Sequence, residues 1–512
     1  MRSSLTVIAR SLGSVVAAAW LAMGASSAGA ADYIRGFEGT SQLDNCALGQ
    51  CFRPPDTMGA IGTTQFVETN NGSITIYNKA TGGIASRVDM PTFWANAGMA
   101  GGANGDQRVL FDHYTNRWIM SGFGSTGNKI NIAVSDTADA LGTWKSTQIV
   151  GAAFGVSATT LDYPTLSLDD KGVYIGTNNF PNAGGFSGTS LFVIPKTSLF
   201  GGAPSLAGIT NFTTALAGTD RGFAIQAALN WQGNATNTVS VIADSRDFNA
   251  QVFYKVNGVN APGATQTASQ LIAGSGYDVA GPGRQADGTR LVDTLSPRIT
   301  ANAVQFDGKI FSTATVMADA AVGDYAAVRW TVVDANTGAL LSSGKVQQAG
   351  YDYYEGSIAV NEFGEVVIAY NRSGFTKGDN NGDGLDDGNI SFLATAFDVG
   401  GNTLVQDGLE LLLKVSGISD YRCGERSVIS LTCRQRWGDY AAVTIDPNDH
   451  HKFYAIGEYA SEWAVINGFT TTERAIWHTF IAEIGFVPEP GSLALFAAGL
   501  FALSATRRRK LH

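Results

Sequence analysis

A strand pattern that recurs along the chain constrains its fold more than any other feature of the sequence. Each copy begins with a polar or acidic residue, continues as a strand of alternating apolar and polar residues, turns, and continues as a second alternating strand. Alternation with a period of two is typical of hairpins that are buried on one face. The copies begin at seven lead residues: Asp56, Asp106, Asp162, Gln226, Arg298, Glu355 and Asp439.

The spacing of the lead residues predicts one repeated module. Successive lead residues lie 50 to 84 positions apart, and a repeat of roughly this length made only of strands fits one four-stranded blade of a β-propeller. Only 15% of the residues are charged and 62 are glycine, which argues against both a disordered chain and a helical protein. We therefore expect an all-β fold with a single β-propeller of seven blades. Six blades, or paired β-sandwiches, are the alternatives.

The N-terminus has the order of a secretory signal peptide. Arg2 and Arg10 are followed by an apolar stretch at 15–23 and by the small residues Ala28-Gly29-Ala30, where cleavage is expected. We expect residues 1–30 to be removed, so that a propeller domain spans 31–486 and a sorting signal occupies 487–512. A buried N-terminal helix is the alternative.

The C-terminus carries three elements in a fixed order: Pro-Glu-Pro at 488–490, an apolar run at 493–505 and a basic cluster at 507–510. The apolar run is short for a stable transmembrane helix, which needs about 20 residues. This order resembles the PEP-CTERM sorting signal of Gram-negative bacteria. The resemblance implies export, cleavage by an exosortase, transient contact of the C-terminal segment with the membrane, and delivery to the cell surface or an extracellular matrix. It suggests extracellular polysaccharide as a partner. An ordinary tail anchor is the alternative.

Charge and cysteine content agree with an exported protein. Without its two ends the chain keeps 28 basic and 43 acidic side chains, a net charge of −15, which repels nucleic acid and excludes it as an expected partner. Four cysteines predict two disulfides in an oxidising compartment. Three pairings are open, and the simplest is local: Cys46 with Cys51 and Cys423 with Cys433.

The lead residues are candidates for a functional site. In a propeller the innermost strands line a central channel, so we expect all seven lead residues to surround one mouth of it. Crowded carboxylates repel one another unless a cation or an arginine compensates, and crowding raises some of their pKa values. The ring could bind a cation or ligand, or Asp106, Asp162, Glu355 and Asp439 could supply the acid and base of glycan cleavage. Alternatively, these residues only hydrogen-bond backbone amides in solvated loops.

A second candidate site lies in the acidic segment 378–388. Asp379, Asn381 and Asp383 alternate along the chain and Gly384 follows them, which is the first half of a calcium loop. Ile390 occupies the position where an EF-hand needs its last ligand, so an EF-hand is excluded. The segment resembles the calcium loops of integrin-like propellers, and that resemblance implies Asp387 as the closing Ca²⁺ ligand. A solvated acidic turn is the alternative.

Further features bear on architecture and on ligand class. The segment 135–144 resembles the Asp-box turn of sialidase-type propellers, which supports a propeller and implies no activity. Five aromatic residues near the lead carboxylates are candidates for a sugar cleft or for the core: Tyr163, Tyr353, Tyr354, Trp437 and Tyr440. Because nucleophile, phosphate-loop and dinucleotide motifs are lacking, we expect an exported propeller with a binding or structural role and bound calcium. A glycan hydrolase or lyase acting at the channel mouth is the alternative.

Overall fold

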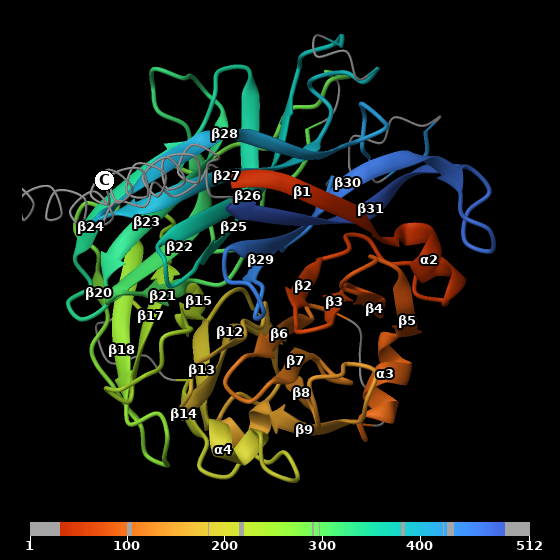
Figure 1. Ribbon diagram of the computed structural model, residues 1–512. Helices are drawn as coiled ribbons and strands as arrows, with labels where there is room; N and C mark the ends of the chain where they lie inside the picture. Colours follow the sequence, from red (N-terminus) through yellow and green to blue (C-terminus); the bar gives the residue numbers. More distant parts are fainter. Residues whose placement is uncertain are drawn as a thin grey trace, which may run out of the picture. The chain divides into compact units, whose positions relative to one another are not determined.

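The computed structural model describes residues 31–486 apart from the segments 100–104, 183, 214–219, 289–290, 296, 380–383, 423 and 427–434. The predicted signal peptide, residues 1–30, and residues 487–512 lie outside the described residues. Tyr33–Gly485 form one compact unit. It contains seven separate sheets of four or five strands, arranged as a seven-bladed β-propeller (Figure 1). The predicted fold class and the blade number are therefore confirmed.

The first three blades are formed by consecutive segments of the chain. Blade 1 consists of β2 (Met58–Ile61), β3 (Gln65–Thr69), β4 (Ser73–Asn78) and β5 (Ile84–Asp89). Blade 2 consists of β6 (Arg108–Asp112), β7 (Arg117–Phe123), β8 (Lys129–Ser135) and β9 (Trp144–Val150). Blade 3 consists of β10 (Thr159–Asp162), β11 (Ser167–Leu168), β12 (Gly172–Pro181), β13 (Gly188–Pro195) and β14 (Thr210–Phe212).

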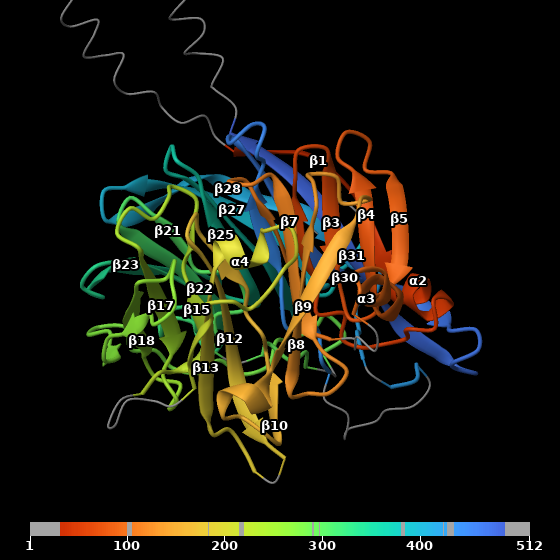
Figure 2. The same cartoon turned by 90° about the horizontal axis from the view of Figure 1, so that it is seen from below.

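The next three blades follow in the same way, and Figure 2 shows the first four side by side in chain order. Blade 4 consists of β15 (Phe223–Ala227), β17 (Thr238–Asp244), β18 (Gln251–Asn257), β19 (Thr265–Gln266) and β20 (Gln270–Leu271). Blade 5 consists of β21 (Val304–Phe306), β22 (Lys309–Met317), β23 (Ala326–Asp334) and β24 (Leu340–Val346), with β16 (Leu229–Asn230) parallel to β21. Blade 6 consists of β25 (Tyr351–Val360), β26 (Glu365–Gly374), β27 (Ser391–Gly400) and β28 (Thr403–Val415).

The seventh blade combines the two ends of the described chain. It consists of β29 (Ala442–Ile445), β30 (Lys452–Val465), β31 (Glu473–Phe486) and, beyond β31, β1 (Ala31–Ser41) (Figure 1). The Arg35 guanidinium in β1 lies 2.6 Å from the Glu483 carboxylate in β31. The Thr40 amide donates to the Thr479 hydroxyl at 2.8 Å. The N-terminal strand thus closes the ring of blades.

The few helices are short, and local sequence explains where the first two begin. They are α2 (Gln42–Ala47), α3 (Met90–Asn96), the 3₁₀ helix η1 (Gly151–Phe154) and α4 (Lys196–Leu199). Ser41 and Asp44 form a reciprocal capping box on α2, and the Asp89 side chain caps α3. No helix in the described part of the chain has the length and apolarity needed to cross a membrane.

One of the two predicted disulfides lies at the end of α2. Cys46 and Cys51 are bonded, which confirms the local pairing. Cys423 and Cys433 lie outside the described residues, so their pairing stays a prediction.

Apolar side chains of neighbouring blades pack against each other and form the core between the sheets. One cluster joins blades 1 and 2 through Ile76, Trp94 and Trp118, all at most 6% exposed. The chain enters several innermost strands through a left-handed residue; Asp56, Asp106 and Glu355 have φ near +50°. This conformation is uncommon for residues other than glycine, and Asp is one of the residues that tolerates it.

Candidate functional site

Carboxylates from several blades meet where the innermost strands begin, at one mouth of the central channel. The Asp439 amide of blade 7 donates to the Asp56 carboxylate of blade 1 at 2.9 Å. Burial raises the pKa of Asp56 well above its usual range, and Asp439 and Asp106 raise it further. Burial, and then Asp162 and Asp439, raise the pKa of Asp106 to about 7. Residues 383 positions apart in the sequence therefore share one electrostatic environment.

Two glutamates complete the cluster. Glu355 sits at a bulge in β25, where its amide donates to the Thr315 hydroxyl at 3.1 Å. Burial raises the pKa of Glu355 well above its usual range, followed by repulsion from Glu458 and Asp439. The Oε1 atom of Glu355 is buried and has no hydrogen-bond partner among the described residues. Protonation of Glu355, or a positively charged group beside it, would therefore reduce the free-energy cost of burying this carboxylate.

Glu458 extends from β30 into the same cluster. Its side chain is 1% exposed, and burial raises its pKa well above the usual range although contacts with Thr57 lower it. A Cβ atom at Gly438 would lie 2.5 Å from Oε1 of Glu458. Glycine at 438 thus provides the space that the buried carboxylate occupies.

We call this cluster the acidic mouth. Its carboxylates are Asp56, Asp106, Asp162, Asp293, Glu355, Asp439 and Glu458.

Three arginines face these carboxylates. The Arg436 guanidinium lies 2.5 Å from Asp439; burial lowers its pKa, but Asp439 and Asp56 outweigh burial and the net pKa is raised. The Arg298 guanidinium lies 5.1 Å from the ring centres of both Tyr163 and Phe223. These contacts place guanidinium groups of the protein itself against a carboxylate and against aromatic rings.

Arg108 closes the channel directly below the mouth. It extends from β6 of blade 2, donates to the backbone oxygens of Pro164 at 3.2 Å and Thr300 at 3.0 Å, and lies 3.6 Å from the ring centre of Tyr440. Only 2% of the residue is exposed. One buried arginine thus connects blades 2, 3, 5 and 7 across the axis.

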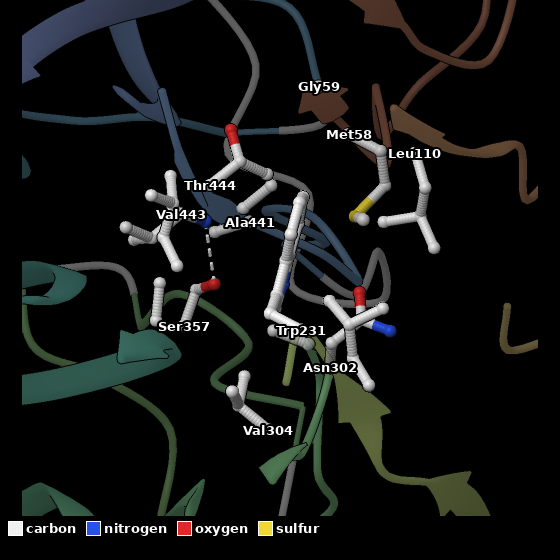
Figure 3. A pocket seen from close by; sticks show the side chains of 15 residues that line it. Met58, Gly59, Leu110, Trp231, Asn302, Val304, Ser357, Ala441, Val443 and Thr444 are labelled. Atoms are coloured by element: carbon white, nitrogen blue, oxygen red, sulfur yellow. Dashed lines mark hydrogen bonds between the residues drawn. The ribbon is translucent and has the colours of Figure 1, made fainter. Parts of the chain in front are cut away.

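The channel continues below Arg108, and Figure 3 shows side chains that line it there. Small and apolar residues of the innermost strands line it, and the Val443 amide donates to the Ser357 hydroxyl at 2.9 Å. The remaining cavity of about 10 Å³ holds one water molecule at most. The acidic mouth is therefore a site at one end of the channel and not the entrance to a pore.

The structure brings together six of the seven lead residues, namely the five carboxylates and Arg298. Gln226 lies deeper, on β15, where its amide donates to the Ile299 backbone oxygen at 3.3 Å. The sequence prediction missed Arg108, Asp293, Arg436 and Glu458. A charged residue inside an apolar strand was the available signal for Glu458 and Arg108.

The five aromatic residues predicted near the carboxylates are core residues. All of them are at most 2% exposed, so none offers a ring face to a ligand. A different row of rings flanks the mouth: Phe223 packs on Phe186 at 5.0 Å and on Phe248 at 5.1 Å, and Phe186 packs on Phe180 at 5.8 Å. Three of these rings are half-buried, since only Phe223 belongs to the buried core.

The structure describes the predicted calcium loop in part. Asp379 accepts a hydrogen bond from the Gly384 amide at 2.7 Å, and the Asp387 amide donates to the Gly378 oxygen at 3.0 Å. Asn381 and Asp383 lie outside the described residues, so calcium at this loop stays a prediction. Within the described part of the chain, no three His, Cys, Asp or Glu side chains are placed to hold a metal ion.

Segment 135–144 forms the turn between β8 and β9, the third and fourth strands of blade 2. The Asp136 amide donates to the Thr143 oxygen at 2.8 Å and closes this hairpin.

Comparisons with known proteins identify the sorting signal. Residues 486–510 match the PEP-CTERM protein-sorting motif, so the chain carries the signal of an exported, exosortase-sorted protein. No curated protein matches the chain. Among solved structures, a protein of unknown function from Dyadobacter fermentans is 8% identical with a TM-score of 0.38, covering 90% of this chain and 100% of that one. Drosophila semaphorin 1b, extracellular domains 1–2, is 8% identical with a TM-score of 0.38, covering 90% and 88%. An α-L-arabinanase of Penicillium chrysogenum complexed with arabinobiose is 11% identical with a TM-score of 0.39, covering 72% and 100%.

Proposed function

We propose that this exported propeller is a binding protein whose acidic mouth holds an extracellular polysaccharide that carries amino groups. The observation that carries the proposal is the charge of the mouth. Seven carboxylates face three arginines among the residues that the structure describes. Such an imbalance raises carboxylate pKa values until protons or a cationic ligand compensate it.

The kind of cation follows from what the mouth already accommodates. Guanidinium groups of the protein itself occupy it, one against Asp439 and one between the rings of Tyr163 and Phe223. An ammonium group has the same charge and also binds to carboxylates and aromatic faces. The half-buried rings of Phe180, Phe186 and Phe248 extend the site outwards, and sugar rings stack on such faces. An amino sugar in a polymer combines both features.

The proposal is tested with glucosamine oligosaccharides and their N-acetylated counterparts of equal length, titrated calorimetrically at low salt. We expect the free amines to bind and the acetylated chains to bind at least tenfold more weakly. Asp162→Asn should weaken the binding of free amines about tenfold, the equivalent of about 1.4 kcal/mol. Asp324→Asn is the matched control, because the Asp324 side chain is 83% exposed and pairs with Arg284 and not with a residue of the acidic mouth, and it should bind like wild type. Equal binding of both oligosaccharides, or none, refutes the proposal.

A second candidate function is glycan cleavage at the same mouth. The pKa of Asp106 near 7 suits a general acid, while the Asp439 carboxylate beside Arg436 suits the ionised partner that cleavage requires. Release of reducing sugar from a polysaccharide panel by wild type, and its loss in Asp439→Asn, would support this function. No release by wild type would exclude cleavage of the polysaccharides tested and leave the binding function in place.

A further inference from the structure

The opposite mouth of the channel opens into a second cavity of about 380 Å³, within the range of small-ligand sites. Its residues lie at or just after the ends of innermost strands that point away from the acidic mouth; Gln305 and Phe306 are the last two residues of β21. We call it the basal cavity and define it by His113, Trp231, Gln232, Gln305, Phe306 and Glu362. The narrow channel separates the two sites, so each must bind its own ligand.

Ring stacking and hydrogen bonds of neighbouring residues surround Trp231 in this cavity. Its ring lies 4.2 Å from that of His113 at an angle of 21°, and His113 lies 3.8 Å from the ring of Tyr114. The Tyr114 hydroxyl donates to the Asn230 oxygen at 2.8 Å and accepts from the Gly233 amide at 2.7 Å, on both sides of Trp231 in the sequence. Trp231 borders the channel as well as the basal cavity (Figure 3). The indole is therefore held in place before any ligand arrives.

The lining of the basal cavity is close to electrically neutral. Its described lining holds no lysine or arginine, and its one carboxylate, Glu362, already pairs with the His450 imidazole. Burial is the main cause that lowers the pKa of His113 to about 4, so this imidazole is uncharged at neutral pH. An anionic ligand would find no lysine or arginine in the described lining. A cationic ligand would have to compete with His450 for the Glu362 carboxylate.

Two amide side chains supply hydrogen bonds. Gln232 uses its oxygen to accept from the Asp307 amide at 2.7 Å, which leaves its NH₂ group available. The Gln305 side chain is half-exposed in the cavity and has no protein partner among the described residues. A purely apolar ligand would leave these amides without partners, at a cost in binding free energy. The ligand must therefore have hydroxyl groups as well as an apolar face.

We propose that the basal cavity binds an uncharged sugar, with the apolar face of one ring on the aromatic wall formed by Trp231 and Phe306 and its hydroxyl groups on Gln232 and Gln305. The basal cavity and the acidic mouth lie at opposite ends of the channel and bind different ligands. The acidic mouth binds positively charged sugars, and the basal cavity binds uncharged ones. An extracellular polysaccharide that contained both kinds of sugar could bridge propellers end to end.

The test uses the full exported chain and three sets of sugars titrated calorimetrically: glucose, galactose, mannose and cellobiose as neutral sugars, glucuronate and galacturonate as acids, and glucosamine as the amine. We expect at least one neutral sugar to bind this site, and its uronate to bind at least tenfold more weakly. Gln305→Ala should weaken the neutral sugar three- to tenfold and Trp231→Phe at least threefold. Phe363→Ala is the matched aromatic control, because Phe363 is 56% exposed and stacks on His451 outside the cavity.

Crossed variants separate this proposal from the proposed function. Asp162→Asn should leave the neutral sugar unaffected, and Gln305→Ala should leave glucosamine oligosaccharides unaffected. The proposal is overturned if no neutral sugar of the panel binds, if uronates bind equally well, or if Gln305→Ala and Trp231→Phe both bind like wild type. If Asp162→Asn loses the binding of amines and no neutral sugar binds, the proposed function of the acidic mouth is supported and the sugar site in the basal cavity is overturned.

Discussion

Asp106→Asn tests whether the buried Asp106 carboxylate binds a proton in the folded state and thereby makes the stability of the protein depend on pH. Asn tolerates the left-handed backbone that Asp106 adopts, with φ of +54°. The Asp106 amide can keep its hydrogen bond to the Asn71 side chain, 3.1 Å long. The substitution therefore removes one titrating carboxylate with little change of shape.

The size of the effect follows from the pKa. Asp106 titrates near 7 when folded, against 3.8 in an ordinary setting. Between these values the folded state holds a proton that the unfolded state has lost, so stability falls as pH rises through the interval. Each pH unit costs about 1.4 kcal/mol, so a rise from pH 5 to pH 8 costs about 3 kcal/mol, because the loss ends near pH 7. Asn does not titrate, and the variant should lack this loss.

Urea unfolding at pH 5, 6, 7 and 8, with disulfides oxidised, measures the difference. The free energy of unfolding of Asp106→Asn, minus that of wild type, should increase by about 3 kcal/mol from pH 5 to pH 8. Asp324→Asn replaces a carboxylate that is 83% exposed and should show no such trend. A difference that is constant with pH would refute the view that burial and the neighbouring carboxylates hold this proton.

Three further predictions concern the channel, the disulfide and the predicted calcium loop. Arg108→Met leaves two buried carbonyl oxygens without a donor and should lower the free energy of unfolding by about 2–6 kcal/mol, about 1–3 for each oxygen; an unchanged melting temperature would contradict its role across the axis. Replacing Cys46 and Cys51 with serine should cost about 2 kcal/mol, as expected for so short a loop, and equal urea midpoints would contradict this. A chelator should lower the melting temperature of wild type but not of Asp383→Ala, because Ca²⁺ would stabilise the folded loop by mass action; indifference of wild type to chelator and to millimolar Ca²⁺ would mean that the loop is only a turn.

Much of the fold could be predicted because the strands of each blade leave a pattern within a short stretch of sequence. An alternating strand, a turn and a second alternating strand lie within about 20 residues, so the repeat is visible without tertiary information. Closure of the ring is different. The partner of β1 is β31, more than 400 positions away, and no local pattern specifies a pairing over such a distance.

The acidic mouth could be predicted only where the repeat itself supplied the residues. Asp56, Asp106 and Glu355 occupy equivalent strand entries, so their convergence followed from the fold. Arg436 lies in the long connection between β28 and β29, where no repeat applies. Glu458 lies on the second strand of its blade, and period-two alternation does not tell which end of that strand reaches the axis. Of the two alternatives open for Tyr440, a sugar cleft or the core, the structure gives the core, since Tyr440 is fully buried.

The acidic mouth depends on ring closure, because one of its hydrogen bonds joins the first blade to the last. The Asp439 amide reaches Asp56 only when blade 7 is docked against blade 1. Glu68 of blade 1 strengthens the same junction, since it accepts from the Thr40 hydroxyl of β1 at 2.9 Å and from the Thr479 hydroxyl of β31 at 2.8 Å. A ligand of the acidic mouth can bind only when the ring of blades is closed. Its binding free energy therefore stabilises the closed ring relative to the open one. Repulsion among the carboxylates of the acidic mouth opposes closure of the ring, and a cationic ligand would reduce that repulsion.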